Sequence, residues 1–143
     1  MSVVDQLTKE GRLERVEADL AAASTKLDEA RRHLVSAAAI AASDLHGAYA
    51  LLYDAARKAI DAHMAASGLR VAKNKPGAHE VSGRYAVSVL GRSDRKDDIR
   101  AFDRMRRNRN RSEHGVWQVG RTTLDADLEH ARGIVHAVEQ ALS

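Results

Sequence analysis

The sequence has no cysteine, a single proline and very few aromatic residues. The lack of cysteine excludes a disulfide framework, a thiolate zinc site and a cysteine nucleophile. Aromatic residues make up 3% of the chain, whereas sandwiches and barrels of short strands need more aromatic and β-branched side chains. No apolar run approaches the roughly 20 residues of a membrane-spanning helix, and the start, MSVVDQLTKEGRLERVE, lacks the pattern of a secretory signal. We therefore expect a cytoplasmic protein that does not bind membranes.

The residues that are abundant favour helices. Alanine, arginine and leucine are the most abundant residues, and all three are strong helix formers. Hydrophobic residues make up 44% and charged residues 30% of 143 residues, a balance that supports one packed core. The sequence therefore predicts an all-α protein with a single domain over residues 1–143. The net charge of +3 indicates a mild preference for anionic partners.

Two long helices are predicted in the first half, after a charged N-terminal helical extension over residues 1–23. Apolar residues recur at spacings of three and four from Leu27 to Ala41. Asp44 is a suitable N-cap for a second long helix, and Gly68 follows its apolar stripe as the residue that ends it. We expect these two helices to pack antiparallel.

The second half begins with a predicted mobile loop over residues 71–83, which contains the only proline and two glycines. A brief helix over 85–90, a helix over 97–114 and a final helix from Thr122 follow. Thr122 and Asp125 have the spacing of a capping box. Apolar residues of the final helix step by four and three from Leu124 to Leu142, which is typical of bundle packing. The prediction is a bundle of four to five helices.

An arginine cluster lies in the predicted helix over 97–114. The run RMRRNRNR places five arginines in eight residues without an acid: Arg104, Arg106, Arg107, Arg109 and Arg111. A solvated helix face is one explanation for such a run. However, a continuous helix distributes these five side chains around its axis, so some must face packed protein or a partner.

The end of this helix resembles a known motif. The run R-N-R-S-E-H places Arg109 five residues before His114, which resembles the R-x4-6-H signature of HEPN domains. The segments GAYALLYDAARKAIDAHMAASGLR and FDRMRRNRNRSEHG are similar to the second long helix and the motif helix of small actinobacterial HEPN-like proteins. GRLERVEADL and the closing helix fit the same layout, so the resemblance covers nearly the whole chain.

The resemblance implies a dimeric, metal-independent endoribonuclease without a cofactor, plausible as a toxin or phage-defence effector. In such a site Arg109 and His114 are catalytic, Asn110 supports the histidine, and Arg104, Arg106, Arg107 and Arg111 bind RNA phosphates. Histidine suits transfer of the 2′-hydroxyl proton because its ordinary pKa is near neutral, and arginine stabilises the charge that develops on the phosphate. The expected product carries a 2′,3′-cyclic phosphate. An antitoxin or regulatory protein is a further implied partner.

Three features leave alternatives open. Arg109 and His114 are about 140° apart on an ideal helix, so two protomers or a loosened helix end would be needed to aim both at one phosphate. Val116 stands where related toxins carry a tyrosine that receives AMP, so adenylylation is not expected. Arginine and histidine near a helix C-terminus also have a purely stabilising role. A non-catalytic helical module that binds a protein or nucleotide, and a basic nucleic-acid binder, therefore remain as alternatives.

Overall fold

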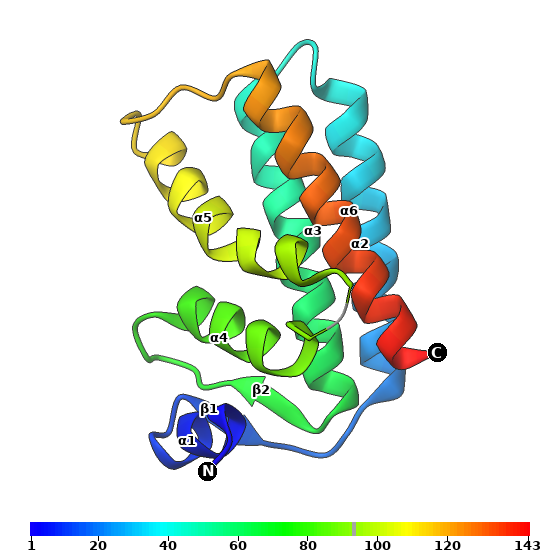
Figure 1. Ribbon diagram of the computed structural model, residues 1–143, viewed down its shortest axis with the longest axis vertical. Helices are drawn as coiled ribbons and strands as arrows, with labels where there is room; N and C mark the ends of the chain where they lie inside the picture. Colours follow the sequence, from blue (N-terminus) through cyan, green and yellow to red (C-terminus); the bar gives the residue numbers. More distant parts are fainter. Residues whose placement is uncertain (93) are drawn as a thin grey trace.

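The computed structural model describes residues 1–92 and 94–143 and is predominantly helical, which confirms the all-α prediction. The described residues form six helices and one two-stranded ribbon (Figure 1). The elements in chain order are α1 (Val3–Lys9), β1 (Leu13–Arg15), α2 (Leu20–Ile40), α3 (Leu45–Ala66), β2 (Leu69–Val71), α4 (Ala78–Leu90), α5 (Lys96–Glu113) and α6 (Arg121–Leu142). No described helix has the length and apolar character needed to cross a membrane.

Three long helices form the main layer. In Figure 1, α2 runs in the opposite direction to α3 and α6, while α5 and α4 lie against α3. As predicted, Asp44 caps α3, because its carboxylate accepts a hydrogen bond from the Gly47 amide at 2.8 Å. The capping box at the start of α6 does not form. Gly120 is the N-cap of that helix without a side-chain bond, and Asp125 pairs with Arg121 at 3.0 Å.

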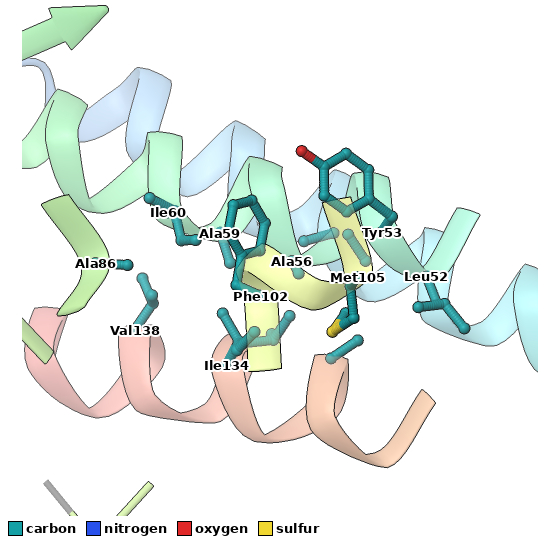
Figure 2. Packing of buried hydrophobic residues seen from close by; sticks show 14 of the residues in the cluster. Leu52, Tyr53, Ala56, Ala59, Ile60, Ala86, Phe102, Met105, Ile134 and Val138 are labelled. Carbon is teal, nitrogen blue, oxygen red and sulfur yellow. The ribbon is translucent and has the colours of Figure 1, made fainter. Parts of the chain in front are cut away.

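The core lies where α3, α5 and α6 meet. Figure 2 shows side chains of these helices packed together, with Tyr53 at the edge and its hydroxyl directed away from the cluster. The rings of Tyr53 and Phe102 stack with centroids 5.2 Å apart. The apolar residues Ile99, Phe102 and Met105 of α5 are all buried. The predicted stripe of the final helix is also buried from Leu124 to Val138.

The prediction of a helical extension over residues 1–23 is wrong in its middle part. The helix α1 stops at Lys9, and Gly11 has a φ of 73°, a left-handed conformation that glycine adopts without strain. The chain then forms β1, which pairs antiparallel with β2. A strand of three residues is too short to show a recognisable alternation of apolar and polar residues. Its extended conformation depends on pairing with β2, which lies 56 residues later in the chain.

The predicted loop over residues 71–83 is shorter than expected. Its first residue belongs to β2, and α4 begins at Ala78 instead of Tyr85. Gly77, with a φ of 79°, is the N-cap of α4, so the proline and glycine mark the point where the helix starts. His79 therefore lies in the first turn of a helix, and Val81 joins the buried face.

Two glycines with the same backbone conformation give a matched test of the contact between residue 16 and the end of α3. Gly11 and Gly68 both have a φ of 73°, but a Cβ atom on Gly68 would lie 2.9 Å from the Val16 carbonyl oxygen, whereas Gly11 has nothing within 4 Å. We expect Gly11→Ala to lower the free energy of unfolding by about 1–2 kcal/mol. Gly68→Ala should cost roughly 1–3 kcal/mol more, because the backbone must move. Equal losses in urea denaturation would contradict this contact.

Candidate functional site

The motif helix α5 presents one apolar and one cationic surface. Its inner positions pack on α3 and α6, which leaves the arginines on the flanks and outer face. The helix ends as predicted: His114 is the C-cap, and Gly115 follows with a φ of 70°. The Val116 amide donates a hydrogen bond to the Arg111 carbonyl at 2.9 Å, which closes this end of the helix.

Although the arginine run contains no acid, the fold supplies carboxylates to most of it. Arg104 pairs with Asp127 of α6 at 2.5 Å. Asp103 forms ion pairs with Arg106 at 2.9 Å and with Arg107 at 3.7 Å. The exposed Arg111 makes no ion pair with any residue that the structure describes. Arg107 and Arg111 are therefore the proposed RNA-binding arginines that are most accessible to phosphates.

The partner of Arg104 is itself buried. Only 1% of the Asp127 side chain is exposed, and its other oxygen accepts a hydrogen bond from the Tyr49 hydroxyl at 2.7 Å. Asn108 donates to the same hydroxyl at 3.3 Å, and Trp117 packs edge-on against the Tyr49 ring. Arg104 therefore contributes to the packing of α5 on α6, in addition to the RNA contact that the sequence suggests.

This arrangement predicts different effects for two neighbouring arginines. Arg104→Ala leaves the buried Asp127 carboxylate without its cation, which should lower the free energy of unfolding by about 1–3 kcal/mol. Arg107→Ala removes a guanidinium that is 63% exposed, so we expect a change within about 0.5 kcal/mol. Thermal or urea unfolding of both variants measures the difference. A stability loss confined to Arg107→Ala would contradict the assignment.

Arg109 is turned toward the interior. Its side chain is only 24% exposed and pairs with Glu113 at 3.1 Å, the pairing that their spacing of four residues favours. Its guanidinium carbon lies 5.7 Å from the centroid of the Tyr53 ring, within the range of a cation–π contact. The Nε–H of Arg109 is buried and has no acceptor among the residues that the structure describes. Arg109 thus has one hydrogen-bond donor that no described residue satisfies.

His79 also belongs to this cluster, although its position in the sequence does not reveal it. Its Nδ1 lies 2.9 Å from the Tyr53 hydroxyl, and the two rings are 5.6 Å apart. Burial, followed by the nearby charges of Arg57 and Arg109, lowers the pKa of His79. Burial likewise raises the pKa of Tyr53, so the neutral phenol is available to donate to a neutral imidazole.

His114 occupies a different position from Arg109. It is exposed at the C-cap, and its backbone amide donates to the Asn110 carbonyl at 3.2 Å. Within the described part of the chain, the side chains of Asn110 and His114 make no hydrogen bond with each other or with another residue. The geometry therefore does not provide the support of His114 by the Asn110 side chain that the resemblance suggests. It also places Arg109 and His114 on different sides of α5 within one chain.

A second histidine lies near the end of the motif helix. His46, in the first turn of α3, contacts the Ser112 hydroxyl through Nδ1 and the Gln118 side chain at 3.3 Å through Nε2. It is separated from Ser112 by 66 residues, so no local pattern predicts this contact. His46 joins α3, α5 and the segment before α6 at the edge where His114 is exposed.

Three histidines should make the free energy of unfolding depend on pH. Burial is the largest cause that lowers the pKa of His33, His63 and His79 in the folded protein. The unfolded chain therefore binds more protons as the pH falls below about 6.5, so the stabilisation present above that value is lost on acidification. We expect the urea concentration at the unfolding midpoint to decrease as the pH is lowered from about 7.5 to about 5.5. His63→Gln should reduce this fall, and an equal fall in the variant would contradict the role of His63.

The residues described do not bring together three His, Asp or Glu side chains that could hold a metal ion. No protein-family model, curated protein or solved structure significantly matches the chain.

Proposed function

We propose that the chain is a metal-independent endoribonuclease of the HEPN type that acts as a dimer, in the role of a toxin or phage-defence effector. The observation that carries the proposal is the exposed His114 imidazole at the end of an arginine-rich helix. No ion pair or side-chain hydrogen bond with the described residues occupies this ring. Its neighbour Arg111 is also exposed, so a phosphate at this edge could meet a proton-transfer group and a cation together.

The proposed reaction divides two tasks between two groups. His114 takes the proton of the 2′-hydroxyl, and the 2′-oxygen bonds to the adjacent phosphorus as the bond between phosphorus and the 5′-oxygen breaks. The 5′-oxygen takes up a proton from the imidazolium or from water, which leaves a 2′,3′-cyclic phosphate. An arginine stabilises the negative charge on the phosphate oxygens. Arg109 is the arginine that the motif assigns to this second task.

Two protomers supply a geometry that one chain does not. Since Arg109 faces Tyr53 and His114 faces solvent, a composite cleft would combine Arg109 of one protomer with His114 of the other. Val116, two residues after His114, is 68% exposed. This side chain lies on the edge that the composite cleft would bury.

The pairing of Arg109 with Glu113 and Tyr53 favours one alternative. If these contacts persist in the assembled protein, the chain is a non-catalytic helical module that binds a protein or nucleotide partner. An RNA cleavage assay in EDTA distinguishes the two functions. The proposal predicts fragments ending in 2′,3′-cyclic phosphate from the wild-type dimer. Intact RNA after incubation with a confirmed dimer, on several RNAs, would favour the module.

A further inference from the structure

A cavity of about 350 Å³ lies at the lower end of α3 in Figure 1, between α2, α3, β2 and the start of α4. Its volume is in the range of sites for small ligands. Part of its wall is apolar and is formed by Met64, Leu69 and Val71. The cavity contains none of the motif residues Arg109, Asn110 and His114, and it adjoins their cluster through His79, which contacts Tyr53.

Cationic side chains reach this cavity from four segments of the chain. Lys26 comes from α2, Arg57 from α3, Arg70 from β2 and Lys73 from the turn that follows. Asp61 is the one carboxylate among the described lining residues. The lining therefore has a positive net charge, which favours an anionic ligand.

Two of these cations form no ion pair with the described residues. Arg57 pairs with Asp61 at 3.1 Å, and Arg70 pairs with Glu14 at 2.7 Å. Lys26 and Lys73, by contrast, make no ion pair or hydrogen bond with any residue that the structure describes. Arg57 also keeps a buried Nε–H that lacks an acceptor among those residues.

Hydrogen-bond donors at the start of α4 complement the lysines. His79 lines the cavity, and its Nδ1 is occupied by the Tyr53 hydroxyl. When Tyr53 donates to Nδ1, the neutral ring carries its proton on Nε2 and can donate it to a ligand. Gly77, the N-cap of α4, has no side chain to accept from the first amides of the helix.

We propose that this cavity binds a small organic phosphate, with its phosphate between Lys26 and Lys73 and its apolar body against Met64, Leu69 and Val71. A dianionic phosphate can accept from two separate ammonium groups and from the His79 imidazole at once. A monoanionic carboxylate satisfies fewer of these donors. The apolar wall then adds affinity that inorganic phosphate alone cannot gain.

Isothermal titration calorimetry of the full chain with phenyl phosphate tests the proposal. We expect phenyl phosphate to bind with one site per chain, more tightly than inorganic phosphate. Lys26→Gln and Lys73→Gln should each weaken binding roughly tenfold, which corresponds to the loss of one charged hydrogen bond. Lys75→Gln is the matched control, since Lys75 lies in the same turn as Lys73 but does not line the cavity. This control should bind as the wild type does.

Three results would overturn the proposal. Equal binding by Lys73→Gln and Lys75→Gln would place the anion elsewhere. Binding of phenylacetate as tight as that of phenyl phosphate would remove the preference for phosphate. Displacement of phenyl phosphate by short RNA, together with binding of RNA that depends on Lys26, would make the cavity part of an RNA surface. Because the readout is binding, it does not depend on whether the chain cleaves RNA.

Discussion

A His114→Ala protein is expected to lose RNA cleavage by a factor of roughly 10²–10⁴ while its fold and dimer persist. This factor is the rate enhancement that a general acid or base typically contributes, which the substitution removes. Because His114 is exposed and its side chain has no partner among the described residues, truncation of its ring removes no packing. The stability of the variant should therefore stay within about 0.5 kcal/mol of the wild type.

The matched control for this variant is His136→Ala. His136 lies on α6, outside the motif helix, and is partly buried, so its loss tests whether any histidine affects the assay. We expect unchanged cleavage from His136→Ala. Cleavage rates measured in EDTA on one labelled RNA compare the two proteins directly. If His114→Ala cleaves as fast as His136→Ala, His114 is not the proton-transfer group.

The second large effect concerns the core. Phe102 is fully buried, stacks on Tyr53 and lies within 4 Å of the position that a Cβ atom on Gly83 would occupy. Phe102→Ala should lower the free energy of unfolding by about 3–5 kcal/mol, because three helices meet at this ring and cannot all close the cavity. Phe102→Leu keeps most of the volume and should cost about 1.5 kcal/mol or less. Equal urea midpoints for Phe102→Ala and the wild type would contradict the central place of this residue.

Stacking on Tyr53 also connects the core with the proposed site. The same Tyr53 ring faces the guanidinium of Arg109, and its hydroxyl contacts His79. A loosened core at Phe102 should therefore disturb the position of Arg109. Phe102→Ala is expected to reduce cleavage even under conditions in which the variant remains folded.

Much of the fold could be predicted from the sequence because the long helices carry regular apolar stripes. These stripes, in α2, α3 and α6, are local features that can be recognised without knowing which elements pack together. The same holds for the helix ends at Asp44, Gly68 and Gly115. The ribbon could not be predicted, since β1 and β2 have three residues each and stabilise one another across a long interval. The start of α4 at Ala78 could not be predicted, because the proline and glycine just before it are typical of the centre of a loop.

In the candidate site, too, a contact within one helix could be predicted, whereas contacts between distant elements could not. The pairing of Arg109 with Glu113 follows from their spacing on one helix, and the structure confirms it. The roles of His79, Asp127 and His46 could not be predicted, because each contacts the motif helix or its partners from a distant element. Residues 104–111 contain no acid, yet Asp103 and Asp127 reach three of their arginines in the fold.

The central claim is that Arg109 and His114 act together across two protomers. Arg109→Ala and His114→Ala chains, co-expressed with different tags and purified as a mixed dimer, test it most directly. In a symmetric dimer one of the two clefts then keeps both residues, so the mixed dimer should recover about half of the wild-type cleavage, while each homodimeric variant stays inactive. A mixed dimer as inactive as its two parents, beside an active wild-type dimer, would show that the two residues do not form a composite site.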